Sequence, residues 1–154
     1  MKLTFWAALW IFLIDQISKF IVVQWMDLKT VGAIDVLPPL LNFRMAWNTG
    51  INFGLFSTAP WVLIGLATGI VVAVIIWVWR EQSVGKWGYI SAGLLVGGAL
   101  GNVIDRIVYG AVADFLNMAC CGIDNPFAFN VADISIFAGA LGLIFFTGEK
   151  APKT

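Results

Sequence analysis

Four long apolar stretches constrain the fold of this chain more than any other feature of its sequence. They cover residues 3–26, 61–79, 87–109 and 132–147. A helix needs about 20 apolar residues to cross the roughly 30 Å of hydrocarbon in a bilayer, so only the fourth stretch is slightly short. Because 60% of the residues are hydrophobic and 12% are charged, the composition differs from that of soluble domains. The sequence predicts a mainly α-helical integral membrane protein, with four transmembrane helices in one membrane domain covering residues 1–154.

Lysine and arginine in the segments that flank the helices predict the orientation, because these residues are enriched on the cytoplasmic side. With the N-terminus inside, five such residues lie in the cytoplasm and two lie outside. The five are Lys2, Arg80, Lys86, Lys150 and Lys153, and the two are Lys29 and Arg44. Both termini are therefore expected in the cytoplasm, with outer loops at about residues 27–60 and 110–131.

The first outer loop contains two stretches that are typical of short strands. Residues 31–37 and 40–47 are rich in β-branched and aromatic side chains, and Pro38-Pro39 separates them. We expect two strands around a turn on the outer surface, because open sheet edges cannot face hydrocarbon. The second outer loop contains scattered glycine and proline, and it is expected to be irregular.

Glycines recur at intervals of four residues on two of the predicted helices. Gly93, Gly97 and Gly101 do so on the third helix, and Gly65 and Gly69 do so on the second. Small residues at this spacing allow helices in a membrane to approach closely. The pattern predicts tight packing at both sites.

Charged and amide side chains gather at the predicted outer ends of three helices. A carboxylate at the bilayer centre costs about 2.5–3.5 kcal/mol on insertion scales, so such residues indicate a functional site. Asn102, Asp105 and Arg106 have the i, i+3, i+4 spacing that places them on one helix face. The whole set comprises Asp15, Lys19, Asn102, Asp105, Arg106, Asp114, Asn130 and Asp133.

Ion pairing accounts for some of these charges, because buried charges are normally paired. Asp15 and Lys19 are four residues apart on the first helix and can form a pair. Asp105 can pair with Arg106 or with a cation on a neighbouring helix. This interpretation makes these residues part of the scaffold.

Asp114 and Asp133 have no cation assigned to them, unless Lys29 or Arg44 folds over the site. Asp133 also suits the first turn of a helix, where a negative charge is favourable. The alternative is a catalytic pair, because two adjacent carboxylates share one proton. The ionised member then acts as a base on water, and the protonated member polarises the scissile carbonyl.

Several other classes of site are not indicated by the sequence. There is no histidine, which removes Ser-His-Asp and Cys-His triads and any histidine-bound metal. Cys120 and Cys121 are adjacent, without the spacing of a metal motif, and are interpreted as small, partly apolar residues in a loop. We expect no metal and no cofactor. The net charge of zero gives no reason to expect a nucleic-acid partner.

Two alternative functions remain open at this stage. A small proton or ion transporter subunit would also carry carboxylates within the membrane, but at several depths, including the inner half. A Ser/Lys peptidase would use Lys19 as the base for Ser18 or Ser135. Ser18 and Lys19 are adjacent, and neighbouring helical residues point about 100° apart, which makes them a poor catalytic pair.

Five motifs occur in order along nearly the whole chain. They are Asp15-Gln16-Ile17-Ser18-Lys19, Asn48-Thr49-Gly50 with Phe53-Gly54, the run from Gly97 to Arg106, Val112-Ala113-Asp114-Phe115, and Phe129-Asn130-Val131-Ala132-Asp133. In these motifs the chain resembles the lipoprotein signal peptidases (signal peptidase II), a family of bacterial membrane aspartic proteases. One departure is Ile51-Asn52, where the family commonly has two small residues. It is expected to alter lipid or antibiotic contacts.

The resemblance implies a fold and an activity. The fold would have four transmembrane helices, both termini in the cytoplasm, and a small extracytoplasmic β subdomain from the first outer loop. The enzyme would lie in the bacterial cytoplasmic (inner) membrane, in contact with lipid, with its site near the outer leaflet. It would remove signal peptides from prolipoproteins by cutting before a diacylglyceryl-modified cysteine. Globomycin-type peptide antibiotics would inhibit it, and a monomer is expected.

The resemblance also implies roles for single residues. Asp114 and Asp133 match the catalytic pair of the family. Asn102 and Arg106 match residues that hold the substrate or the inhibitory antibiotics. The residues expected to support the site are Asp15, Lys19, Asn48, Gly98, Asp105 and Asn130.

Overall fold

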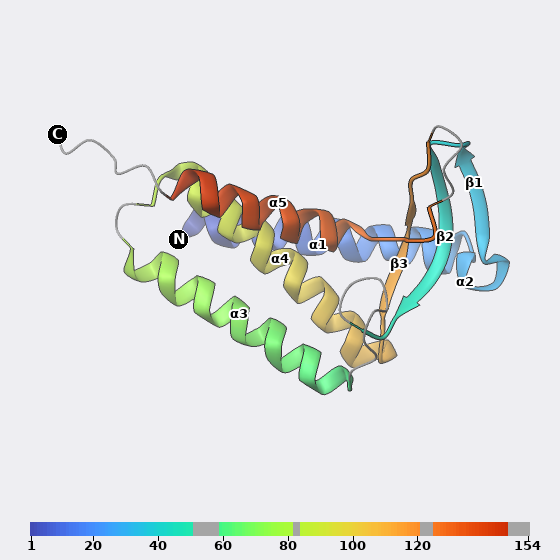
Figure 1. The fold of residues 1–154 in the computed structure, drawn as a ribbon. Helices are drawn as coiled ribbons and strands as arrows, with labels where there is room; N and C mark the ends of the chain where they lie inside the picture. Colours follow the sequence, from blue (N-terminus) through green and yellow to red (C-terminus); the bar gives the residue numbers. More distant parts are fainter. Residues whose placement is uncertain (51–58, 82–83, 121–124, 148–154) are drawn as a thin grey trace.

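The computed structural model describes residues 1–50, 59–81, 84–120 and 125–147. Long helices run side by side, and a small sheet lies at one end of them (Figure 1). The helices of the bundle are α1 (Lys2–Lys19), α3 (Pro60–Arg80), α4 (Lys86–Tyr109) and α5 (Val131–Phe146). These bounds lie within about two residues of the predicted ones, except at the end of the first helix.

The first helix changes its winding near the sheet. After Lys19 it continues as a π-helical segment, η1 (Phe20–Trp25), so that the whole span is Lys2–Trp25. Within the described residues, this span, α3 and α4 are long and apolar enough to cross a membrane, whereas α5 is shorter. The fold is thus mainly helical, with three long apolar helices and a shorter fourth.

Helix α4 lies at the centre of the bundle and packs closely against α1 and α5. A Cβ atom added at Gly97 would lie 2.5 Å from the carbonyl oxygen of Ala8 on α1, and one added at Gly98 would lie 2.5 Å from that of Ala132 on α5. Only glycine fits at such backbone contacts. The predicted close approach is confirmed on this helix.

Helix α3 packs chiefly against α4 and makes a looser contact. Gly65 and Gly69 are exposed, and a Cβ atom added at either position would have no described atom within 4 Å. The prediction of tight packing at these two glycines is wrong, because they do not face a neighbouring helix.

The sheet is antiparallel, with strand order β1-β2-β3. Strands β1 (Ala33–Leu37) and β2 (Leu41–Asn48) confirm the two strands expected in the first outer loop. Strand β3 (Val112–Asn117) comes from the second outer loop, so the expectation of an irregular loop there is wrong. Strand β3 forms because the edge of β2 offers it backbone hydrogen-bonding groups. Such non-local pairing is hard to predict from a short segment of sequence.

The sheet is held to the helices by an apolar cluster. Val22 and Val23 of η1, Leu28 of the short helix α2 (Leu28–Val31), and Ala113 and Phe115 of β3 are buried together. This cluster fixes the position of β3 relative to the ends of the helices.

Candidate active site

Asp114 is placed by the turn that connects α4 to β3. Helix α4 ends at Gly110, which adopts the left-handed conformation (φ 73°) that favours glycine at a helix end. The chain then enters β3, where Asp114 pairs with Ala46 of β2. Its side chain is buried, and Asn48 of β2 donates a hydrogen bond from Nδ2 to its Oδ2 at 3.0 Å.

Asp133 is placed by the start of α5. Asn130 caps this helix, since its Oδ1 accepts a hydrogen bond from the backbone N–H of Asp133 at 2.9 Å. In return, Oδ2 of Asp133 accepts from the backbone N–H of Asn130 at 3.2 Å, which completes a capping box. The interpretation of Asp133 as a residue of the first helical turn is therefore confirmed. The same carboxylate also accepts from Asn102 Nδ2, at 2.9 Å to its Oδ1.

Asn130 brings the two aspartates together. Its Nδ2 donates to Oδ1 of Asp114 at 2.6 Å, while its Oδ1 and backbone N–H hold Asp133. The orientation of this amide is fixed, because its oxygen faces a backbone donor and its nitrogen faces a carboxylate. One amide thus links a strand and a helix that are distant in sequence.

The environment of Asp114 favours its protonated form. Burial, together with the negative charge of Asp133, raises the pKa of this carboxyl to about 7, against the hydrogen bond from Asn48, which lowers it. Asp114 can therefore hold a proton near neutral pH while a neighbouring carboxylate is ionised.

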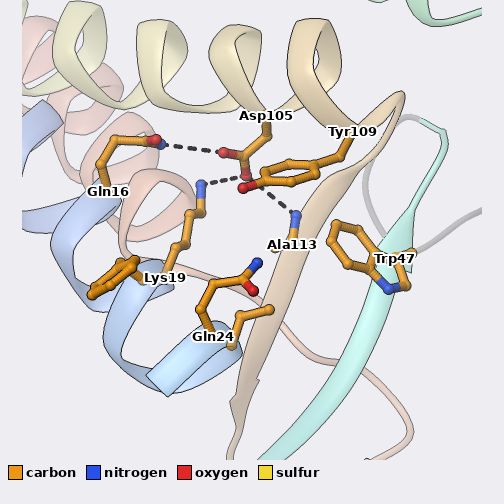
Figure 2. A pocket seen from close by; sticks show the side chains of 9 residues that line it. Gln16, Lys19, Gln24, Trp47, Asp105, Tyr109 and Ala113 are labelled. Atoms are coloured by element: carbon orange, nitrogen blue, oxygen red, sulfur yellow. Dashed lines mark hydrogen bonds and ion pairs between the residues drawn. The ribbon is translucent and has the colours of Figure 1, made fainter. Parts of the chain in front are cut away.

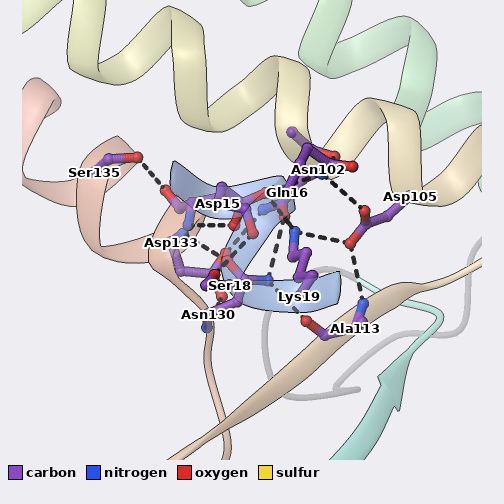
Figure 3. A network of polar contacts seen from close by, with 12 residues as sticks. Asp15, Gln16, Ser18, Lys19, Asn102, Asp105, Ala113, Asn130, Asp133 and Ser135 are labelled. Atoms are coloured by element: carbon purple, nitrogen blue, oxygen red, sulfur yellow. Dashed lines mark hydrogen bonds and ion pairs between the residues drawn. The ribbon is translucent and has the colours of Figure 1, made fainter. Parts of the chain in front are cut away.

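The remaining charges of the cluster meet at Lys19. Its Nζ lies 2.8 Å from Oδ2 of Asp15 and 2.8 Å from Oδ2 of Asp105 (Figure 3). The predicted Asp15–Lys19 pair is confirmed. Asp105 pairs with a cation of a neighbouring helix, which was one of its two expected partners, and no ion pair joins it to Arg106 among the described residues.

Each of the two scaffold aspartates also holds a backbone N–H next to a candidate catalytic residue. Oδ1 of Asp15 accepts from Ala132 N at 2.9 Å, and Ala132 precedes Asp133. Oδ2 of Asp105 accepts from Ala113 N at 3.2 Å, and Ala113 precedes Asp114 (Figure 2). The ion-pair cluster and the candidate catalytic pair are therefore directly connected.

Arg106 of α4 takes no part in the ion pairs of this cluster among the described residues. It donates from NH2 to the carbonyl oxygen of Gly50 at 3.2 Å and from NH1 to that of Asn102 at 3.3 Å. Its Nε is buried and has no partner in the part of the chain that the structure describes. This donor is therefore not engaged by any described acceptor.

A groove of about 440 Å³ between α3, α4 and α5 leads to this point. Asn102, Arg106 and Asp133 form its polar end. The rest of its wall is apolar and consists of Leu63, Leu66, Ala67, Ile70, Leu95, Ala99, Ile136, Phe137 and Ala140. The groove can accept an extended apolar group with a polar centre at one end.

A second, smaller cavity of about 170 Å³ lies near η1 and the sheet (Figure 2). Lys19 and Asp105 contribute to its wall, together with Trp47 and Tyr109, whose rings are 5.5 Å apart. Neither candidate catalytic aspartate lines it. Lys19 and Asp105 therefore border a different cavity from the groove that Asp133 lines.

Lys29 and Arg44, the cations considered as covers for the aspartates, are engaged elsewhere. Lys29 donates to Oε1 of Gln24 at 2.6 Å, and Arg44 forms an exposed ion pair with Asp35 at 2.7 Å. Among the described residues, neither cation forms an ion pair with Asp114 or Asp133, as was expected from the sequence.

The arrangement does not suit a Ser/Lys peptidase. Ser18 Oγ donates to the carbonyl oxygen of Asp15 and Ser135 Oγ to that of Ala132, at 2.7 and 2.8 Å. Neither hydroxyl bonds to Lys19 in the described chain. The buried charged side chains of the described residues, Asp15, Lys19, Asp105 and Asp114, also belong to one connected polar network, whereas a transporter was expected to carry carboxylates at several depths.

One residue of the network was not anticipated. Gln16 donates from Nε2 to Asp15 at 3.1 Å and to Asp105 at 3.2 Å (Figure 3). Its place within the Asp15–Lys19 segment was the available signal.

Several positions discussed from sequence lie outside the described residues, namely Ile51, Asn52, Phe53, Gly54, Cys121, Gly122, Lys150 and Lys153. Cys120 is described and is not a free thiol.

Comparisons with known proteins agree with the resemblance in sequence. The family model described as Signal peptidase (SPase) II, Peptidase_A8, matches residues 7–147. The lipoprotein signal peptidase of Nitrobacter hamburgensis is 36% identical over 153 residues, covering 95% of this chain and 92% of that protein. The lipoprotein signal peptidase of Rhodopseudomonas palustris is 37% identical over 139 residues, with coverages of 86% and 83%.

Solved structures share the fold. A bacterial membrane enzyme determined at 2.3 Å resolution superposes with a TM-score of 0.82 at 28% identity, covering all of this chain and 94% of the other. A second, determined at 1.9 Å resolution, gives a TM-score of 0.81 at 27% identity, with coverages of 98% and 96%.

Proposed function

Because this chain belongs to the signal peptidase II family of bacterial membrane aspartic peptidases, we propose that Asp114 and Asp133 carry out its lipoprotein signal peptidase reaction. The observation that supports this assignment most directly is the double contact of Asn130, which holds one aspartate through its Nδ2 and the other through its Oδ1. By contrast, Asp15 and Asp105, two other buried aspartates of the described chain, are both paired with Lys19.

In the proposed reaction the pair holds one proton. Asp114 keeps it, since burial raises the pKa of this carboxyl to about 7. Asp133 is ionised, helped by its place at the start of α5, where the helix dipole favours negative charge. Asp133 takes a proton from water as the water oxygen bonds to the scissile carbonyl carbon, and Asp114 donates its proton to the carbonyl oxygen.

The tetrahedral intermediate then collapses. The C–N bond breaks as Asp133 gives its proton to the leaving nitrogen, which becomes the amino group of the new N-terminal cysteine, and a hydroxyl of the intermediate returns a proton to Asp114 as it becomes the new carbonyl group. The signal peptide leaves with a new carboxylate. Because the atoms and protons balance without a further reactant, the two aspartates and one water are sufficient for the chemistry.

The substrate is proposed to be a prolipoprotein whose cysteine carries diacylglycerol. The groove between α3, α4 and α5 has an apolar wall for the signal peptide or for acyl chains, and it ends at Asp133. Arg106 can donate to the substrate backbone, since its buried Nε has no partner among the described residues. Peptide antibiotics of the globomycin type would compete for the same groove.

Asn102 is better suited to positioning than to binding. Its Oδ1 accepts from Lys19 at 3.3 Å and from Asn130 at 3.3 Å, and its Nδ2 donates to Asp133. Both ends of the amide are therefore occupied before substrate arrives. We assign the substrate contact to Arg106 and a supporting role to Asn102, alongside Asn48 and Asn130.

We further propose that all four helices span the membrane, that the sheet lies on the outer surface, and that both termini are cytoplasmic. The start of α1 and the end of α5 lie at the end of the bundle opposite the sheet (Figure 1). The count of lysine and arginine supports the same orientation. The dyad would then work at the outer leaflet, as a monomer in the inner membrane.

The test is cleavage of a purified diacylglyceryl-modified prolipoprotein by the wild-type protein and by Asp114→Asn and Asp133→Asn. Each substitution removes an ionisable group at nearly constant shape, and kcat is expected to fall by about 10²- to 10⁴-fold. Asp35→Asn is the matched control, because Asp35 is exposed and pairs with Arg44 rather than with a residue of the site, and it should retain normal turnover. Normal cleavage by either dyad variant would refute the assignment.

A further inference from the structure

The ion-pair cluster has contacts that ordinary charge neutralisation does not require. Lys19, Asp15 and Asp105 are buried together, and the two carboxylates exceed the one ammonium by a negative charge. One carboxylate is enough to pair with one ammonium group, and Lys19 contacts two. The excess carboxylate therefore calls for another explanation.

The explanation lies in what each carboxylate holds besides Lys19. Asp15 reaches the backbone N–H of Ala132, at 2.9 Å, in the residue before Asp133. Asp105 reaches the backbone N–H of Ala113, at 3.2 Å, in the residue before Asp114. The two contacts are equivalent in kind.

A third contact from Lys19 reaches the dyad through a side chain. Nζ of Lys19 donates to Oδ1 of Asn102 at 3.3 Å, and Nδ2 of Asn102 donates to Asp133 at 2.9 Å. Because an ammonium group can only donate, it fixes the oxygen of the amide on its own side and leaves the N–H₂ group for the carboxylate.

We propose that Lys19 is a positioning residue that sets the separation of the two catalytic carboxylates. It acts on α5 through Asp15, on β3 through Asp105, and on Asp133 itself through Asn102 (Figure 3). The proposal rests on the assignment of Asp114 and Asp133 as the catalytic pair. It gives the excess carboxylate a purpose, since one aspartate is needed for each strand or helix that carries a member of the pair.

The packing around the cluster favours such a role. A Cβ atom added at Gly101 of α4 would lie 2.5 Å from Oδ2 of Asp15, so the carboxylate fills the space that the glycine leaves open. Lys19 is 6% exposed and Asp15 is fully buried. Groups held this tightly can fix a distance, whereas exposed ion pairs leave it free to vary.

Separation within a carboxylate pair has a measurable signature. When the two carboxyl groups lie closer together, the two pKa values at which the pair loses its protons differ more. The singly protonated, active form then exists over a wider pH range. A change of nearby charge alone moves both limbs of the pH profile in one direction. A change in the separation of the two carboxyl groups instead alters the width of the profile, by about half a pH unit per ångström.

Several charged groups face the two catalytic carboxylates and influence the pH values at which activity rises and falls. They are Arg106 and Asp105 of α4, and Asp15 and Lys19 of α1. Asn48 of β2 faces Asp114 as a neutral group, and the residues of α3 that line the groove are apolar. The width of the profile separates the effect of spacing from the effects of these charges.

The experiment measures kcat/KM against pH for lipidated prolipoprotein cleavage by wild type, Lys19→Met, Asp105→Leu and Gln16→Met. Lys19→Met removes all three contacts and should narrow the profile by about half a pH unit or more. Asp105→Leu leaves Lys19 paired with Asp15 but frees the N–H of Ala113, and it should narrow the profile as well. Gln16→Met is the matched control, because Gln16 contacts both aspartates but none of the groups that carry the dyad, and it should keep the wild-type width.

The outcomes distinguish this inference from the function on which it rests. If wild type cleaves the substrate and Asp114→Asn does not, but Lys19→Met and Asp105→Leu keep the wild-type width, only the positioning role is refuted. A parallel shift of both limbs would assign Lys19 an effect of charge alone and would also refute it. If Lys19→Met fails to fold, the profile width of Asp105→Leu tests the positioning role instead. Folding is monitored by thermal unfolding in detergent, and loss of folding in Asp105→Leu would refute a role confined to the dyad.

Discussion

Helices α3 and α4 look similar in sequence and differ sharply in the structure. Both are long and apolar, and both carry glycines at intervals of four residues. Yet 67% of the most apolar window of α4 is buried within the protein, against 17% for α3. The glycines of α4 meet backbone atoms of α1 and α5, whereas Gly65 and Gly69 of α3 meet no described atom.

The difference lies in the polar residues that accompany the glycines. Asn102 and Asp105 of α4 must be kept out of lipid, and burial against α1 and α5 gives them partners. Helix α3 has no such residue along its apolar length and can face lipid on most of its surface. Glycine spacing permits a close interface, but buried polar groups determine where one forms.

The largest expected effect concerns the close packing of α4. Gly97→Leu would drive a side chain into the backbone of Ala8, which cannot move aside, and it should cost about 3 kcal/mol of unfolding free energy or more. Gly69→Leu in α3, the matched control, meets open space and should change stability by less than about 0.5 kcal/mol. Unfolding in detergent provides the measurement. Equal losses in the two helices would break the comparison.

A smaller effect is expected from pH on the free energy of unfolding. It comes from Asp114 of β3, the strand that follows α4. Burial raises the pKa of Asp114 to about 7, so the folded state holds this proton more tightly than the unfolded chain does. Its contribution to stability is complete at low pH and is lost as the pH rises through about 7. Between pH 5 and pH 7 the loss should amount to about 2 kcal/mol.

The measurement is the free energy of unfolding of wild type and Asp114→Asn at both pH values. The variant lacks the titrating group, so its stability should vary less over this range. Helix α3 cannot contribute, since its only ionisable side chain is Arg80. An unchanged pH dependence in Asp114→Asn would contradict the account.

The smallest effect should come from the α3 wall of the groove. Ala67→Trp would fill part of the groove and should raise KM about tenfold, which corresponds to about 1.4 kcal/mol, with little change in stability. Val72→Trp, on an exposed part of the same helix, should leave KM unchanged. Steady-state kinetics with lipidated substrate compares the two. If the variants behaved alike, α3 would be only a lipid-facing helix.

The parts of this fold that were predictable are those with local causes. The apolar stretches gave the helices, and Pro38-Pro39 between β-branched stretches gave β1 and β2. The Asp15–Lys19 pair followed from its i, i+4 spacing. Each of these depends on residues that are close in the chain.

The parts that were missed depend on distant residues. Strand β3 forms because β2 offers it an edge, and the choice of Lys19 over Arg106 as the partner of Asp105 depends on how α1 meets α4. The exposure of Gly65 and Gly69 likewise depends on which face α3 turns to α4. No periodicity within one segment carries this information.

The capping box at the start of α5 has a consequence for when the enzyme becomes active. Asp133 acquires its geometry from the same hydrogen bonds that begin the helix, and Asn130 reaches Asp114 only once α5 has docked. On the proposed assignment, a chain whose α5 has not docked contains all the catalytic residues but cannot cleave a substrate, because the two aspartates are not held together. Assembly of the bundle would thus complete the catalytic site.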